Sequence, residues 1–217
     1  QGATGEVLRA EGKLLRLHQT GMADQIGKID EELRLAAQLQ KEFLPESVPE
    51  VGDCRFGILW RPAGYVSGDI YDVERLDEKH IGIFLADAVG HGVPAALMTM
   101  FIKRSLRTKE VGPDGYRIVE PGEALARLNT DLAERQTGKV RFATAVYGVL
   151  NTETRVLRIA RAGHPIPMWL KADGPTEMLE PDGGLLGVFP EATFEQSEIT
   201  LGQGDRLLIY SDGFEMA

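Results

Sequence analysis

With 217 residues and 43% hydrophobic content, the chain can bury one sizeable core, and a second domain would be a tight fit. Charged residues make up 26% of the sequence, which is a globular composition and excludes a largely disordered chain. The formal net charge is −9 and no Lys/Arg run stands out, so we expect no nucleic-acid partner.

Cysteine usage and hydropathy indicate the compartment. Cys54 is the single cysteine, which excludes an internal disulfide and a cysteine-based zinc site and is typical of a reducing compartment. The sequence contains neither a stretch of about 18 apolar residues nor a signal peptide, so we predict a cytoplasmic protein with no membrane contact in these residues. The chain starts at Gln1 and stops at Ala217 without a recognisable end signal, and we expect it to be a piece of a longer protein.

Residues 6–44 contain no proline and are predicted to be helical. Mostly apolar residues recur in alternating steps of four and three, which is the seam of a two-stranded coiled coil. The seam positions are Leu8, Gly12, Leu15, Gln19, Met22, Ile26, Ile29, Leu33, Ala36, Gln40 and Phe43. Gly12, Gln19 and Gln40 weaken this seam, so a single amphipathic helix lying on its own domain remains the alternative.

Pro45 and Pro49 end this helix and divide the chain into a coiled-coil linker helix, residues 1–44, and a globular domain, residues 45–217. Strands are predicted over residues 55–60, 70–76, 80–88, 142–150, 155–161, 167–171, 194–201 and 205–210, and helices over 92–108 and 121–136. Strands grouped around two consecutive helices argue against βαβ units. The predicted fold class is therefore α+β, with mostly antiparallel sheets and helices packed outside.

Three aspartates stand where a predicted strand meets a turn or a helix, namely Asp69, Asp87 and Asp212. An acid that ends a buried strand is costly to desolvate without a partner. No obvious Lys or Arg lies beside them, so together they indicate a site for a hard divalent cation such as Mg²⁺ or Mn²⁺. Ordinary turn chemistry is the alternative for each motif taken alone, because Asp-Gly is a common turn pair.

Six short motifs, three of which contain these acids, occur along the chain. They are Ser67-Gly68-Asp69 with Tyr71-Asp72, Asp87-Ala88-Val89-Gly90-His91-Gly92, Phe142-Ala143-Thr144-Ala145, Ala162-Gly163-His164-Pro165, Gly184-Leu185-Leu186-Gly187, and Gly204 to Gly213. This ordered set resembles the bacterial metal-dependent (PPM-type) serine/threonine phosphatases of the sporulation stage II E and stress-response sigma-factor regulator family. The resemblance implies an antiparallel β-sandwich flanked by helices in an αββα arrangement, preceded by the long N-terminal helix.

The resemblance also implies a site with two Mn²⁺ or Mg²⁺ ions. Asp69 and Asp87 would hold the bridged metal pair, and the main-chain carbonyl of Ala88 would supply a further ligand. Asp212 would complete the shell of one metal, and Asp72 is a weaker candidate that acts through water. Such metals polarise a phosphoryl group and activate a water, which implies a protein phosphatase without a covalent intermediate. The family has a final acid in an Asp-Asp pair, which this chain does not reach.

Other polar residues near these motifs have less specific interpretations. His91 and His164 have no partner at zinc-ligand spacing, so we predict that they fix loops by hydrogen bonding. Ser67 and Ser211 lack a Gly-x-Ser-x-Gly elbow, which argues against a serine hydrolase. The segment 90–92 before a helix resembles a phosphate cradle, yet it lacks the lysine of a P-loop.

The resemblance finally implies partners and control. The substrate would be a phosphorylated anti-sigma-factor antagonist protein. An upstream sensor or receiver domain in the same chain would signal through the N-terminal helix, whose seam from Leu8 to Phe43 predicts a parallel homodimer. The helix pair would act as a lever on the Asp87 loop, with a regulatory helix formed by Val93, Leu97, Met100 and Phe101. A non-catalytic signalling module, in which the phosphatase fold serves to bind a partner, is the alternative function.

Overall fold

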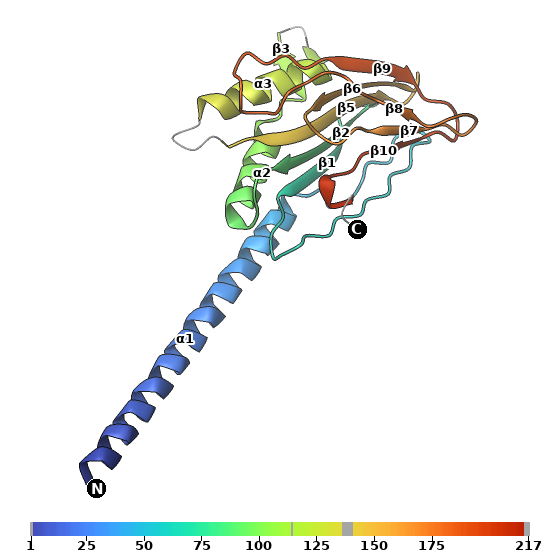
Figure 1. Ribbon diagram of the computed structural model, residues 1–217. Coiled ribbons are helices and arrows are strands. Elements are labelled where there is room, and N and C mark those ends of the chain that lie inside the picture. Colours follow the sequence, from blue (N-terminus) through green and yellow to red (C-terminus); the bar gives the residue numbers. More distant parts are fainter. Residues whose placement is uncertain (1, 114, 136–140, 215–217) are drawn as a thin grey trace.

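In the computed structural model, a long helix projects from a domain of two packed β-sheets (Figure 1). The structure describes residues 2–113, 115–135 and 141–214, and the side chains of these residues from Gly21 onward. Within these ranges, no helix is long and apolar enough to cross a lipid bilayer.

The larger sheet organises the domain. Within the described residues its strands pair antiparallel in the order β1-β2-β5-β6-β9. They are β1 (Asp69–Arg75), β2 (His80–Ala88), β5 (Ala143–Asn151), β6 (Val156–Ala162) and β9 (Gln196–Thr200). The central strand β5 is buried along most of its length, because it is covered on both faces.

Two helices of the described chain cover one face of this sheet, α2 (Val93–Ser105) and α3 (Pro121–Glu134) (Figure 1). Both start with a proline in the first turn, where proline is compatible with the helix. Ile70 and Phe84 of the sheet share one buried core with Ile102 of α2 and with Leu125 and Leu128 of α3. Burying each of these large apolar side chains contributes about 2 kcal/mol relative to exposure.

A smaller sheet packs on the opposite face. Its strands, in spatial order, are β10 (Arg206–Leu208), β7 (Met168–Leu170) and β8 (Glu177–Met178). Trp169 and Leu207 from this sheet pack on Val146, Leu157 and Ile159 of the larger one. The predicted α+β class and antiparallel sandwich are therefore present, whereas the described residues show helices on one outer face and not the predicted second helical layer.

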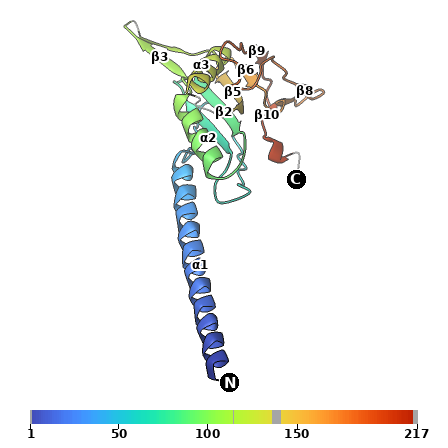
Figure 2. The ribbon, with the colours of Figure 1, turned by 60° about the vertical axis from the view of Figure 1, so that its left-hand side comes forward.

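Two segments differ from the sequence prediction. Residues 55–60, predicted as a strand, form no strand with any described residue, although Phe56 packs on a small buried cluster. A short apolar run favours burial of some of its side chains but does not supply a neighbouring strand. The predicted helix over residues 92–108 ends at Ser105, and a hairpin follows it, formed by β3 (Lys109–Gly112) and β4 (Gly115–Ile118) (Figure 2).

The C-terminal end of helix α1 (Gly2–Glu42) meets the domain, and its N-terminal end points away from it (Figures 1 and 2). Met22 and Ile26 of the predicted seam are 57% and 64% exposed. Leu33 is half-buried and Gln40 is fully buried, so the last turns rest on the domain while the preceding turns do not. The packed-helix alternative therefore holds for the end of α1, and the coiled coil stays a prediction about a second chain.

Candidate functional site

The hairpin of β1 and β2 places two predicted site acids opposite each other. In the antiparallel register Asp69 pairs with Asp87, and paired residues share one face of the sheet with Cβ atoms about 5 Å apart. Their neighbours Ile70 and Ala86 are buried in the core on the helix side, so strand alternation turns both carboxylates to the other face. The site therefore lies where β1 begins and β2 ends.

The turn before β1 is held by the end of α1. Gln40 Nε2 donates to the Ser67 carbonyl oxygen at 2.7 Å, and Gln40 Oε1 accepts from the Ser67 amide at 2.8 Å. The same Nε2 lies 3.3 Å from Thr99 Oγ1 of α2. Ser67 Oγ accepts a hydrogen bond from the Asp69 amide at 3.1 Å. Gln40, expected to be a weak coiled-coil position, thus fixes the backbone beside Asp69, and its amide in an apolar seam was the available sequence signal.

Oxygen atoms converge beside Gly68. A Cβ atom at this position would lie 3.2 Å from the Ala88 carbonyl oxygen, 3.3 Å from Asp87 Oδ1 and 3.4 Å from the Gly90 carbonyl oxygen. The Ala88 amide donates to the Gly68 carbonyl at 2.9 Å, which ties the two turns together. Gly90 and Gly92 have φ values of 96° and 73°, which permit the sharp turn after β2. Gly68 therefore keeps a space beside three oxygens free of any side chain.

The third predicted acid comes from the segment after β10. Asp212 opens a short 3-10 helix, η1 (Asp212–Phe214). The preceding residue, Ser211, donates its hydroxyl to Asp69 Oδ2 at 2.8 Å. Asp69 Oδ1 is buried and has no hydrogen-bond partner among the described residues. The contact of Ser211 with Asp69 spans 142 positions, and such a distance leaves no local pattern in the sequence.

The electrostatics of this site oppose negative charge. Burial, followed by the charges of Asp69 and Asp212, raises the pKa of Asp87 to about 7. Burial also raises the pKa of Asp69, the hydrogen bond from Ser211 opposes this rise, and the charge of Asp212 adds to it. A cation would remove this repulsion, and a donor set made of oxygens suits Mg²⁺ or Mn²⁺. The buried, unpartnered Asp69 Oδ1 and the oxygens beside Gly68 fit such an ion.

The acids do not form a closed cage. In residues 2–113, 115–135 and 141–214, no three His, Cys, Asp or Glu side chains are grouped closely enough to hold a metal ion. The structure brings together the carboxylates of Asp69 and Asp87 with main-chain oxygens beside them. Asp212 lies near enough to contribute charge to both of their pKa values, after the larger effect of burial.

Asp72 does not join these acids. It lies three positions after Asp69, so strand alternation turns it to the helix side of the sheet. There it pairs with Lys103 of α2 at 3.0 Å, and both side chains are 19% exposed. Lys103 also donates to the Phe43 carbonyl at the end of α1. The predicted secondary metal role of Asp72 is thus replaced by an ion pair that connects β1, α2 and α1.

The two predicted loop histidines have different surroundings. His164 is 1% exposed, and its Nδ1 lies 2.7 Å from Thr144 Oγ1. Burial lowers the pKa of His164 to about 4, so its ring is neutral at pH 7. Thr144 pairs with Asp87 across β2 and β5, so His164 supports the strand beside the site. His91 is exposed on the loop that follows Asp87.

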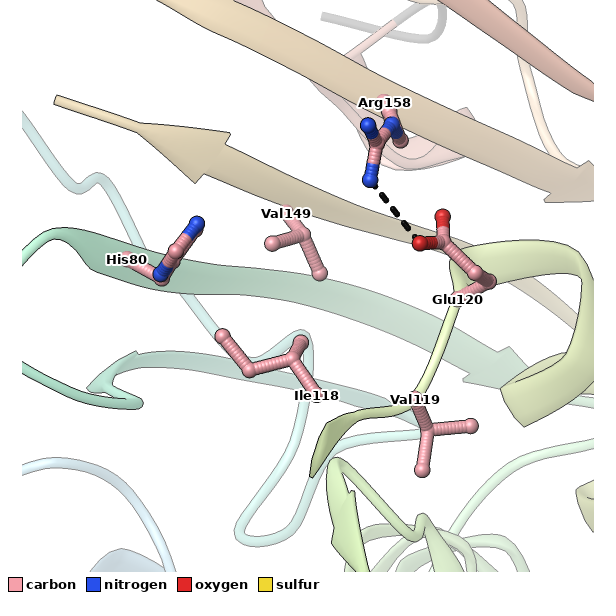
Figure 3. A pocket seen from close by; sticks show the side chains of 6 residues that line it. All are labelled: His80, Ile118, Val119, Glu120, Val149 and Arg158. Carbon is pink, nitrogen blue, oxygen red and sulfur yellow. Dashed lines mark hydrogen bonds and ion pairs between the residues drawn. The ribbon is translucent and has the colours of Figure 1, made fainter. Parts of the chain in front are cut away.

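Figure 3 shows a pocket of about 40 Å³ that His80, Val149 and Arg158 help to line. His80, which lines it, begins β2, and Asp87 stands seven residues along that strand, about 23 Å away. The charged lining residues Arg158 and Glu120 form an ion pair at 2.8 Å. This pocket has room for a few water molecules, and we assign it no part in the chemistry.

Known proteins match the same region. The family model described as Stage II sporulation protein E (SpoIIE) matches residues 77–215. The phosphoserine phosphatase RsbU of Bacillus subtilis (strain 168) is 30% identical over 210 residues, which are 96% of this chain and 60% of RsbU. The phosphoserine phosphatase RsbP of the same organism is 29% identical over 183 residues, which are 84% of this chain and 44% of RsbP. The chain thus spans less than two thirds of each of these curated relatives.

A solved structure has the same architecture. The SiaA-PP2C domain of Pseudomonas aeruginosa is 23% identical, with a TM-score of 0.71 over 87% of this chain and 73% of that one. At this level of identity the likeness concerns the fold, that is, the β-sandwich with helices on the larger sheet.

Proposed function

Because this chain belongs to the stage II sporulation protein E (SpoIIE) family, we propose that it removes phosphate from phosphoserine or phosphothreonine in a protein, with divalent cations. The observation that carries the proposal is the opposed pair of Asp69 and Asp87 beside the oxygens around Gly68. The description of RsbU and RsbP as phosphoserine phosphatases supports the same reaction.

We assign the cation ligands to four residues. Asp69, Asp87 and Asp212 offer carboxylates, and Ala88 offers its main-chain carbonyl. Bound Mn²⁺ or Mg²⁺ supplies Lewis-acid polarisation of the phosphoryl group and an activated water. Asp69 and Asp87 would attract the positive charge of the cation, because burial and mutual repulsion disfavour two charged carboxylates without a partner. Gly68 keeps the adjoining space open.

The serines at this site act on Asp69. Ser67 Oγ accepts from the Asp69 amide, and Ser211 Oγ donates to the Asp69 carboxylate. We assign the attack on phosphorus to the activated water and give both serines a supporting role at Asp69, so the proposed reaction contains no covalent serine intermediate.

Phosphate release from a phosphoserine-bearing anti-sigma-factor antagonist tests this function. The full natural chain is assayed with Mn²⁺, then with EDTA, and then with Mn²⁺ restored. We expect release with Mn²⁺, a loss of roughly 100-fold or more with EDTA, and recovery when the metal returns. Release that is unchanged by EDTA would exclude the cation-dependent reaction.

We further propose that an upstream sensor or receiver domain controls the site through α1 and α2. Gln40 contacts both the turn before Asp69 and Thr99 of α2, so a shift of α1 would act on both. Helix α2 begins just after the loop that follows Asp87. We assign its regulatory role to Val93, Leu97, Met100 and Phe101.

A parallel homodimer through α1 belongs to this proposal. Met22, Ile26 and Ile29 are each more than half exposed, and a second copy of the helix would remove them from water. Sedimentation should give a dimer for the chain and a monomer for the double variant Ile26→Glu, Ile29→Glu. Equal monomer masses for both would contradict the coil. A cytoplasmic location fits the single cysteine, Cys54.

A non-catalytic binding module is the second candidate function. It is favoured by the finding that the described part of the chain contains no group of three metal-binding side chains. A full natural chain that binds the phosphorylated antagonist, yet releases no phosphate with Mn²⁺, would establish this alternative. Release with Mn²⁺ would exclude it.

A further inference from the structure

A hydroxyl from the last described segment holds one of the two opposed acids. Ser211 Oγ donates to Asp69 Oδ2 at 2.8 Å, whereas Asp69 Oδ1 is buried without a partner among the described residues. Ser211 directly precedes Asp212, whose charge acts on both Asp69 and Asp87. We propose that Ser211 is a positioning residue that orients Asp69 for a divalent cation, an inference that rests on the proposed cation-dependent function.

The division of the two Asp69 oxygens supports this role. A carboxylate that accepts a hydrogen bond at one oxygen is fixed in rotation, and its other oxygen is left for a cation. A buried carboxylate oxygen with no donor is unfavourable unless a positive group satisfies it. The geometry therefore assigns Oδ2 to Ser211 and Oδ1 to the cation.

Ser67 provides the contrast. Its hydroxyl also contacts Asp69, but it accepts from the main-chain amide at 3.1 Å and so shapes the turn. Ser211 contacts the carboxylate itself. Loss of such an orienting partner weakens metal affinity by about 10- to 100-fold in metal sites. Ser211 should accordingly affect cation binding without being a nucleophile.

The dissociation constant for Mn²⁺, read from the spin resonance signal of the free ion, tests this role in the full natural chain. Ser211→Ala should bind Mn²⁺ about 10-fold more weakly. Ser211→Thr, which keeps the hydroxyl, should bind Mn²⁺ as the wild type does. Ser197→Ala, a half-buried serine on β9, is the matched control and should change nothing. Wild-type affinity in Ser211→Ala overturns the inference and leaves the phosphatase proposal intact. Absence of Mn²⁺ binding in the wild type overturns both.

The Asp212→Asn variant distinguishes whether Ser211 acts through Asp69 or through Asp212. If Ser211 acts through Asp69, Ser211→Ala should weaken Mn²⁺ binding by a similar factor in the Asp212→Asn variant. No further loss in that background would mean that Ser211 serves to place Asp212, and would overturn the inference. Ser211→Cys, a weaker donor of similar shape, replaces Ser211→Ala if the latter does not fold, and it too should bind Mn²⁺ more weakly. Wild-type affinity in Ser211→Cys would count against the role.

Discussion

The two ends of the β1–β2 hairpin hold aspartates in opposite states. At the turn, Asp77 accepts from the amides of Lys79 and His80, from the His80 ring and from the Tyr116 hydroxyl. Burial alone would raise the pKa of Asp77, but these hydrogen bonds outweigh it and lower the pKa to about 2. At the other end, burial and neighbouring acids raise the pKa of Asp87 to about 7. The donors around Asp77 stabilise its charged form, whereas burial and neighbouring acids disfavour the charged form of Asp87, as expected of the proposed cation site.

Replacing each of these two aspartates by asparagine should reveal the contrast between them most strongly. Asp87→Asn should lower kcat/KM by about 1000-fold or more, because a cation ligand is lost, and should not lower the Tm of the metal-free protein at pH 8. Asp77→Asn is the matched control, and it should keep activity but lose about 1–2 kcal/mol in the free energy of unfolding. Phosphate release and thermal unfolding measure both. A comparable loss of stability in both variants would contradict the contrast.

A methyl group at Gly68 should affect only the end of the β1–β2 hairpin that holds Asp69 and Asp87. Gly68→Ala crowds the oxygens of Ala88, Asp87 and Gly90, so we expect Mn²⁺ affinity to fall by roughly 10- to 100-fold, the range for disturbed metal surroundings. Gly57→Ala is the control, because a Cβ atom there meets nothing within 4 Å. Calorimetric titration with Mn²⁺ measures the affinity of both variants. Equal affinity in both variants would show that the space beside Gly68 is not used.

Protons should compete with the cation near neutral pH. The folded-state pKa of Asp87 is raised to about 7 from 3.8, so its contribution to metal-free stability is full below about pH 4 and is lost as pH rises through about 7. The Tm in EDTA should therefore fall between pH 5 and 8 more in the wild type than in Asp87→Asn. Mn²⁺ binding at pH 6.5 should release roughly one proton, which calorimetry in buffers of different ionisation enthalpy detects. Proton release that persists in Asp87→Asn would show that the proton comes from another group.

The sequence located the acids better than it located their surroundings. Asp69 and Asp87 stand at strand ends in the sequence, and the structure pairs them across the hairpin, while their role as cation ligands stays a prediction. Asp72 was misplaced, since three positions along a strand reverse the face of the sheet. Ser211 reaches Asp69 through a tertiary contact across 142 positions and is therefore not visible in a local pattern.

The fold was predictable in the same uneven way. The antiparallel sheet and the helices on its face follow from local periodicity, whereas residues 55–60 show a strand pattern without a strand beside them. Periodicity describes which face of a segment is buried and says nothing about its hydrogen-bonding neighbour. Gln40 is the opposite case, because an imperfection in the seam is the residue that docks α1 on the domain.

The length of α1 sets the kind of signal that it can transmit. Its 41 residues extend about 60 Å at 1.5 Å per residue. At physiological ionic strength, electric fields are screened over about 8 Å, so a charge near the start of α1 does not influence Asp69 or Asp87. Under the proposed control through α1, what reaches Ser67 through Gln40 is therefore rotation or displacement of the helix. The proposed upstream modules would then be interchangeable, whatever their charge, without changing the pKa of Asp69 or Asp87.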